Sequence, residues 1–196
     1  MAWHLPPIGA RFPRRGNAFS AFIGRTALQM AGWRFEGELP DVPKVLFVVA
    51  PHTSNWDFIL AVAVMFALRI RVNFLGKHTL FRWPLGGFMR WVGGSPVYRH
   101  SPQNAVEQTV EHVRRSDRIA LALSPEGTRR KRQAWRSGFH YVARGAEIPI
   151  LPAAIDYSTR TIRFFPLYQA AETVEADLAT LGALFHSGMA RHPAQY

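Results

Sequence analysis

Residues 50–58 read A-P-H-T-S-N-W-D-F, and this stretch joins a predicted buried strand to a predicted helix. The strand is expected over residues 45–49, because V-L-F-V-V is a short apolar run rich in β-branched residues. Pro51 ends the strand, and the polar residues 53–55 are typical of a helix N-terminus. The apolar segment 58–68 then predicts the helix itself. A strand followed by a helix is the repeating unit of an α/β fold.

His52 and Asp57 lie on either side of this junction. In such a turn, the Asp57 carboxylate can fold back and accept a hydrogen bond from one ring nitrogen of His52. The other nitrogen is then left unprotonated and faces outward, as a general base requires. A helix cap beside a loop histidine has the same spacing, so the spacing alone leaves both interpretations open.

Strand and helix patterns alternate along the rest of the chain. Further strands are expected at residues 72–75, 119–123, 148–155 and 161–165, and helices at 79–91, 101–115, 134–145 and 171–186. This alternation predicts an α/β domain built on a single open mixed sheet flanked by helices. There is no internal repeat or interdomain linker, so we expect residues 44–196 to form one domain.

The preceding segment, residues 1–43, begins with a Pro- and Arg-rich stretch and contains a predicted amphipathic helix over residues 17–33. The helix either packs on the core or dips its apolar side into one membrane leaflet. In the second case Arg11, Arg14 and Arg15 lie at the level of the lipid phosphates, where each basic residue contributes about 1 kcal/mol to docking. The large apolar residues of this helix are Phe19, Phe22, Ile23, Met30 and Trp33.

Composition limits the classes of partner and chemistry. The chain has 196 residues, enough for one sizeable core, and its net charge of +11 implies a polyanionic partner. Nucleic acid, an anionic membrane surface and a phosphorylated substrate all fit that charge. The absence of cysteine excludes disulfides and thiolate nucleophiles, and the histidines show no metal-ligand spacing, so no metal is expected.

Apolar runs in this sequence are shorter than the roughly 18 residues of a spanning helix. The N-terminus also lacks the pattern of a secretory signal, because prolines and arginines precede any apolar run. We therefore expect a cytoplasmic protein that lies on the inner face of the membrane without crossing it.

A second block, S-P-E-G-T-R at residues 124–129, follows the predicted strand 119–123. Together with H-x4-D it resembles the glycerophosphate and lysophospholipid acyltransferase family, which includes 1-acylglycerol-3-phosphate acyltransferase. Two weaker blocks also resemble that family, G-G-S-P-V-Y-R at residues 93–99 and I-P-I-L-P-A-A at residues 148–154. The four blocks occur in the family's order.

The resemblance implies an O-acyltransferase that moves a fatty acyl group from acyl-CoA or acyl-carrier protein to the hydroxyl of a lysophospholipid-like acceptor, without a further cofactor. His52 is then the general base, and Asp57 fixes its tautomer and stabilises the imidazolium. The acceptor hydroxyl attacks the thioester directly, so no protein nucleophile is required.

The resemblance also implies an acceptor side of the site made from the second block, residues Glu126, Gly127, Thr128 and Arg129. An arginine fork such as that of Arg129 can grip a phosphate in two places. Lys77, in a G-K-x-x-L-F segment similar to part of the family, and Arg99, at the end of the 93–99 block, are weaker candidates for the same anion.

Two alternatives stay open. The motif variants H-T-S-N-W-D-F and S-P-E are not the commonest in the family. The acceptor could therefore instead be a lyso-aminolipid or another alcohol. A basic membrane- or nucleic-acid-binding protein is the other alternative. Pure binding does not require a base, and no recognised nucleic-acid module surrounds the basic run 129–132, so no nucleic-acid partner is expected.

Overall fold

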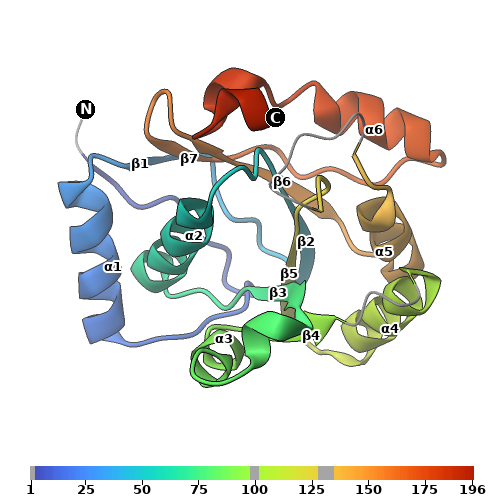
Figure 1. Cartoon of the computed structure of the whole chain (residues 1–196), viewed down its shortest axis with the longest axis horizontal. Helices are drawn as coiled ribbons and strands as arrows, with labels where there is room; N and C mark the ends of the chain where they lie inside the picture. Colours follow the sequence, from blue (N-terminus) through green and yellow to red (C-terminus); the bar gives the residue numbers. More distant parts are fainter. Residues whose placement is uncertain (1–2, 98–101, 128–134) are drawn as a thin grey trace.

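The computed structural model of the chain describes residues 3–97, 102–127 and 135–196 (Figure 1). Within these residues a seven-stranded sheet has the order β1-β7-β6-β2-β5-β3-β4. Strands β6, β2, β5, β3 and β4 run parallel, and β7 pairs antiparallel with β6, which makes the sheet mixed. The strands are β1 (Arg34–Glu36), β2 (Lys44–Val49), β3 (Asn73–Lys77), β4 (Gly94–Val97), β5 (Ile119–Leu123), β6 (Ile150–Asp156) and β7 (Thr161–Phe164).

Helices cover both faces of the sheet (Figure 1). α1 and α2 pack with one face, and α4, α5 and α6 pack with the other. The predicted single open mixed sheet flanked by helices is therefore confirmed. The helices are α1 (Ala18–Met30), α2 (Asn55–Leu68), α3 (Gly86–Trp91), α4 (Pro102–Arg115), α5 (Gly138–Ala146) and α6 (Val174–Gly182), with short 3-10 helices at His78–Phe81, Ser187–Met189 and Pro193–Gln195.

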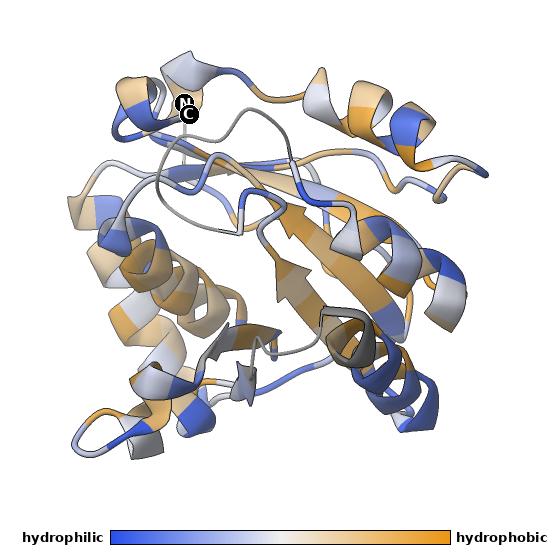
Figure 2. Cartoon of the chain, turned by 45° about the vertical axis from the view of Figure 1, so that its right-hand side comes forward, coloured by the Kyte–Doolittle hydropathy of each residue, from blue (hydrophilic) through white to orange (hydrophobic). Residues whose placement is uncertain are grey.

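Strand β2 lies at the centre of the sheet and is buried on both sides, which explains why its sequence is uniformly apolar rather than alternating. Val45 and Phe47 face the cluster under α2, whereas Leu46 and Val48 face the cluster under α4, α5 and α6. Figure 2 shows this hydrophobic centre between the more polar outer surfaces of the helices.

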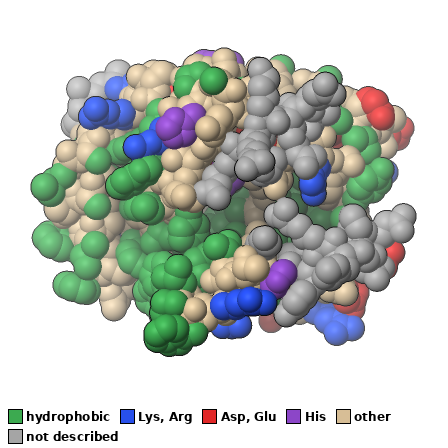
Figure 3. Space-filling model, in the orientation of Figure 1, with side chains coloured by type: hydrophobic (Ala, Val, Ile, Leu, Met, Phe, Trp, Pro, Cys, Tyr) green, Lys and Arg blue, Asp and Glu red, His purple; other side chains and the backbone are tan. Residues whose placement is uncertain are grey.

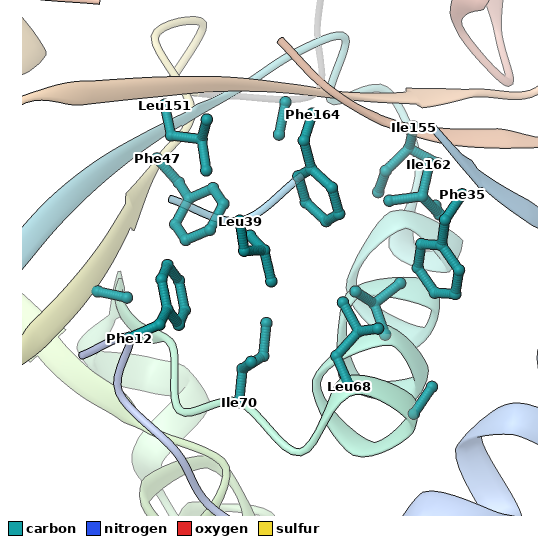
Figure 4. Close-up of a cluster of buried hydrophobic side chains, with 14 of the residues drawn as sticks. Phe12, Phe35, Leu39, Phe47, Leu68, Ile70, Leu151, Ile155, Ile162 and Phe164 are labelled. Carbon is teal, nitrogen blue, oxygen red and sulfur yellow. The ribbon is translucent and has the colours of Figure 1, made fainter. Parts of the chain in front are cut away.

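The cluster under α2 also contains residues from the N-terminal segment (Figure 4). Phe12 and Leu39 are buried beside Phe47 and Phe164 of the sheet and Leu68 of α2. Strand β1 is not among the strands that the sequence pattern predicted. This short edge strand is paired on one side, with β7, so it has little of the apolar run that makes a buried strand recognisable.

Helix α1 forms where an amphipathic helix was predicted, but its buried residues are Ala21, Gly24 and Leu28. It ends at Met30, so Trp33 lies beyond it and is buried in the core. Gly24 lies so close to Ala63 and Ala67 of α2 that a Cβ atom there would clash with their backbone. Phe22 and Met30 instead remain 67% and 84% exposed. Hydrophobic side chains gather along this side of the molecule in Figure 3. No helix in the described part of the chain is long and apolar enough to cross a membrane.

Candidate active site

The site lies where three neighbouring strands of the sheet end. Strands β5, β2 and β6 are adjacent and parallel, so their carboxyl ends meet at one edge. Glu126 follows β5, His52 follows β2, and Tyr157 follows β6 directly. In open α/β sheets, ligands bind at the carboxyl ends of the strands, near the point where the strand order reverses.

The His52 ring contacts the Asp57 carboxylate, as the spacing of the two residues predicted. Nδ1 of His52 lies 3.1 Å from Oδ2 of Asp57, and the Asp57 side chain is only 3% exposed. The backbone N–H groups of Thr53 and Ser54 donate to the same oxygen at 2.9 and 2.8 Å. Asp57 therefore closes a capping box with Ser54, the N-cap of α2, while it holds the histidine.

The second carboxylate oxygen of Asp57 accepts a hydrogen bond from the Tyr157 hydroxyl at 2.7 Å. Burial alone would raise the pKa of Asp57, but the hydrogen bonds from His52, Tyr157 and Ser54 outweigh it and hold the pKa below its usual value. Burial and the bond to Asp57 raise the pKa of Tyr157, so the phenol stays protonated and donates.

These bonds fix the chemistry of the imidazole. An ionised carboxylate can only accept, so Nδ1 of His52 carries the proton that faces Asp57. Nε2 is then the nitrogen with the lone pair, and no hydrogen bond joins it to a residue in the described part of the chain. The His52 side chain is 32% exposed, so a substrate hydroxyl can reach it. An imidazole with a fixed tautomer and a partly exposed ring is suited to act as a general base.

Glu126 joins the two sequence blocks. Both of its carboxylate oxygens lie 3.0 Å from the backbone nitrogen of His52, and the residue is 8% exposed. Glu126 is therefore a buried residue, although it belongs to a loop. Burial raises the pKa of Glu126, although the backbone hydrogen bond from His52 opposes that shift.

Gly127 completes the turn that delivers Glu126. Its N–H donates to the carbonyl oxygen of Ser124 at 3.1 Å, and its φ is +63°, in the left-handed region that favours glycine. A Cβ at this position would also lie 3.0 Å from the Arg136 side chain. The glycine therefore serves the turn and its close packing.

A family model described as Acyltransferase matches residues 35–156, more than half of the 196 residues. The chain belongs to the acyltransferase family. Its fold is similar to the crystal structure of PlsC, the 1-acyl-sn-glycerophosphate (LPA) acyltransferase from Thermotoga maritima, with a TM-score of 0.59 and 15% sequence identity. The similarity covers 85% of this chain and 78% of that one. No curated protein sequence gives a significant match.

The structure describes only part of the predicted acceptor side of this acyltransferase. Thr128, Arg129 and Arg99 lie outside the described residues. Lys77 is the last residue of β3, whose parallel alignment places its backbone at the same edge of the sheet as His52. Among the described residues, no group of three or more His, Cys, Asp or Glu side chains could hold a metal ion.

Sequence reasoning missed two parts of the candidate site. Tyr157 follows a predicted strand directly, and the rule that sites gather at strand ends would have indicated it. For the C-terminal segment, no sequence pattern indicated that it lies beside the His52 loop. There the His192 N–H donates to the Thr53 hydroxyl at 3.2 Å, and the Arg191 guanidinium lies 5.0 Å above the Trp56 ring. Figure 1 shows this segment beside the loop that connects β2 and α2.

Backbone amides in the His52 loop already have carboxylate partners. The N–H of His52 donates to Glu126, and those of Thr53 and Ser54 donate to Asp57. They cannot stabilise a developing oxyanion without giving up these bonds. These three amides are therefore not free oxyanion donors.

Proposed function

We propose that this acyltransferase moves a fatty acyl group from an acyl thioester to the hydroxyl of a lysophospholipid-like acceptor, with His52 as general base. One observation carries the proposal: buried Asp57 holds the His52 ring through Nδ1, while about a third of the His52 side chain stays exposed. Acyl-CoA and acyl-carrier protein are both suitable donors, and no further cofactor is required.

In the proposed reaction, Nε2 of His52 accepts the proton of the acceptor hydroxyl as its oxygen attacks the thioester carbonyl carbon. The tetrahedral intermediate then collapses, and the carbon–sulfur bond breaks. Protonated His52 returns the proton to the departing thiolate. Asp57 stabilises the imidazolium between these two steps, and Tyr157 and the loop amides keep Asp57 in place.

Glu126 acts in this proposal through the His52 loop. Its bond to the His52 amide fixes where the base lies relative to the 124–127 turn, which leads into Thr128 and Arg129. We propose that Arg129, with Lys77 and Arg99, binds the anionic head of the acceptor. A phosphate on the acceptor would suit the two-pronged geometry of an arginine.

The proposed acceptor is a lipid, and a membrane contact suits that substrate. We define the apolar surface as the exposed large hydrophobic residues of α1 and of the segment through α3. This surface would lie against an anionic membrane on its inner, cytoplasmic face, with the chain bound peripherally. Its residues are Phe19, Phe22, Ile23, Met30, Leu80, Trp83, Leu85, Phe88 and Trp91.

The basic residues expected to accompany this surface need revision. Nε of Arg11 lies 3.5 Å from Oδ2 of Asp41, and Arg14 donates to the Leu68 carbonyl oxygen at 3.1 Å. Both side chains therefore have partners within the protein. Arg15 lies over the Trp91 ring, at the border of the apolar surface, and is the one of the three that best suits a lipid phosphate.

The test is to identify the product. The purified chain is incubated with acyl-CoA, or separately with acyl-carrier protein thioesters, and with lysophospholipids, a lyso-aminolipid and simple alcohols. Mass spectrometry should show a new ester on a lysophospholipid, and it should be missing with the His52→Ala variant. Esterification of another acceptor alone would replace the acceptor assignment. Release of free fatty acid without any acylated acceptor would indicate a thioesterase and overturn the proposal.

A further inference from the structure

A pocket lies at the amino end of the sheet, opposite the carboxyl end that carries the active site. It is formed around the amino ends of β3, β4 and β5 and has a volume of about 500 Å³. Strand β5 has five residues, so at about 3.3 Å per residue the two edges are about 16 Å apart. Its charged and titratable lining residues are Arg15, Arg71, Arg90, His112, Asp117 and Arg118.

The charge of this pocket is unbalanced. Its lining includes four arginines and one acidic residue, Asp117. Within the described part of the chain, none of the four arginines forms an ion pair with an acidic side chain. Like charges gathered in one cavity repel one another, and an anionic ligand would remove that cost.

Two of the arginines are held in place by aromatic rings. The Arg15 guanidinium lies 5.1 Å from the centre of the Trp91 ring, and that of Arg90 lies 5.7 Å from the centre of the Phe81 ring. Stacking on a ring leaves the in-plane N–H groups free, and those groups match the oxygen atoms of a phosphate in pairs. The pocket is therefore partly preorganised for a phosphate.

The pocket also borders the apolar surface. Arg15 precedes α1, and Arg90 belongs to α3 next to exposed Trp91. Figure 3 shows hydrophobic side chains over α1 and α3. A phosphate at this border would be attached to an apolar molecule, which is the chemistry of a phospholipid headgroup.

Helix α1 connects this pocket to the active site. It begins just after Arg15 and ends just before Trp33, whose ring contacts that of Tyr157 at 5.1 Å. Its 13 residues span about 20 Å at 1.5 Å per residue. Its exposed apolar side therefore runs from the pocket to the active-site edge, so one membrane plane can meet both.

We propose that this pocket binds the phosphate of an anionic phospholipid that is not consumed in the reaction. The bound headgroup would anchor the amino edge of the sheet while α1 lies along the membrane. The site is distinct from the proposed acceptor site, because Lys77, at the carboxyl end of β3, lies at the opposite edge of the sheet. The inference uses the membrane contact proposed above, but it is tested by binding and not by acyl transfer.

The test compares two double variants of the full chain. Arg71→Gln with Arg118→Gln removes two pocket charges that lie far from His52. Arg144→Gln with Arg160→Gln removes the same charge from exposed positions outside the pocket lining. Binding is measured by cosedimentation with vesicles of phosphatidylcholine, with and without phosphatidic acid, at one fixed salt concentration.

The pocket variant should bind the phosphatidic acid vesicles more weakly by a factor on the order of 10 or more. The control variant should lose less than about 3-fold, as expected for diffuse charge. Equal losses in the two variants, or no loss in the pocket variant, would overturn the proposal. Wild-type chain that binds inorganic phosphate in calorimetry as tightly as it binds the vesicles would reassign the pocket to a soluble phosphate and overturn the lipid assignment. An inactive chain with the expected binding pattern would leave this inference standing while it refutes the acyltransferase reaction.

Discussion

Two His–Asp pairs in this protein are built almost alike. In the active-site edge, His52 Nδ1 lies 3.1 Å from Asp57, which also accepts the Tyr157 hydroxyl and backbone N–H groups. Between α5 and α6, His140 Nδ1 lies 2.7 Å from Asp177. Asp177 likewise accepts a tyrosine hydroxyl, that of Tyr168 at 2.8 Å, and the backbone N–H of Ala171 at 2.7 Å.

The pairs differ in access. The His52 side chain is 32% exposed, whereas that of His140 is 5% exposed and is covered by the helices it connects. A histidine held by a buried carboxylate and a tyrosine is therefore a general base only where a substrate can reach its second nitrogen. In the buried pair, the hydrogen bond between His140 and Asp177 instead holds α6 against α5. Substitutions should separate the two uses, because one pair should control rate and the other stability.

The largest expected effect is that of His52→Ala on acyl transfer. Loss of a positioned base should lower kcat by a factor on the order of 10² to 10⁴. The melting temperature should change little, because the ring is partly exposed and Asp57 keeps its bonds to Thr53, Ser54 and Tyr157. Steady-state kinetics and calorimetry on one preparation check both points. Near wild-type transfer would remove His52 from the mechanism.

Asp57→Asn should come next. An asparagine amide can donate to Nδ1, which would place the proton on Nε2 and remove the basic lone pair from the substrate side. We expect kcat to fall by a factor on the order of 10² or more. Asp177→Asn makes the same chemical change in the buried pair and should leave kcat unchanged. A comparable loss of rate in both variants would show that the comparison measures folding rather than chemistry.

His140→Ala should act on stability. It leaves a buried carboxylate oxygen of Asp177 without its partner and creates a cavity, at a cost of roughly 2–5 kcal/mol in the free energy of unfolding. Urea denaturation measures that loss, and kcat at a temperature where the variant is folded should equal that of wild type. A stable variant with reduced kcat would assign the pair a role in catalysis.

The two tyrosines allow a finer test. Tyr157→Phe removes one hydrogen bond to Asp57, worth about 1 kcal/mol, and should lower kcat several-fold with a small shift in the pH–rate profile. Tyr168→Phe removes the matching bond to Asp177 and should cost about 1 kcal/mol of stability without a change in the profile. If the pH–rate profile of Tyr157→Phe coincides with that of wild type, Tyr157 only supports the fold.

The smallest expected effect is on the pH dependence of the unfolding free energy. The contributions of Asp57 and Glu126 to it should have opposite signs. The pKa of Asp57 is lowered in the folded chain, so its stabilising contribution is complete above its ordinary value of 3.8 and is lost as pH falls through the folded pKa. The pKa of Glu126 is raised, so its ionisation costs stability at neutral pH, and that cost disappears as pH falls to below 4.5.

Unfolding free energies measured across this acidic range check the two signs. The stability advantage of wild type over Asp57→Asn should shrink as pH falls below 3.8. The stability of wild type relative to Glu126→Gln should instead increase as pH falls from neutral toward 4.5. Parallel curves for the two variants would contradict the different environments of the two carboxylates.

How far the sequence predicted the site depended on distance along the chain. His52 and Asp57 are five residues apart in one strand–loop–helix junction, so local geometry made their contact possible, and the family blocks favoured it over a simple helix cap. The bond between Glu126 and the His52 amide joins residues 74 apart, and only the family blocks suggested that the two loops meet. Tyr157 is 100 residues from Asp57 and belongs to no block that was recognised as catalytic.

The N-terminal segment shows the same limit. The amphipathic pattern predicted α1, but it could not tell that Ala21, Gly24 and Leu28 would be buried while Phe19, Phe22, Ile23 and Met30 stay exposed. Packing against α2 decides which side of α1 is buried, because the backbone at Ala63 and Ala67 leaves no room for a side chain on Gly24. Arg11 and Arg14 were counted among the membrane-facing charges because their partners, Asp41 and Leu68, are distant in sequence.

The amino-acid sequence by itself determined the central strand, the helix that follows it and the contact between His52 and Asp57, because these depend on hydrophobic pattern and capping over a few consecutive residues. Only the tertiary structure decided which His–Asp pair is exposed and which is buried. It also decided that the ends of β5, β2 and β6 bring Glu126, His52 and Tyr157 to one edge, since strand order is set by packing between segments far apart in the chain.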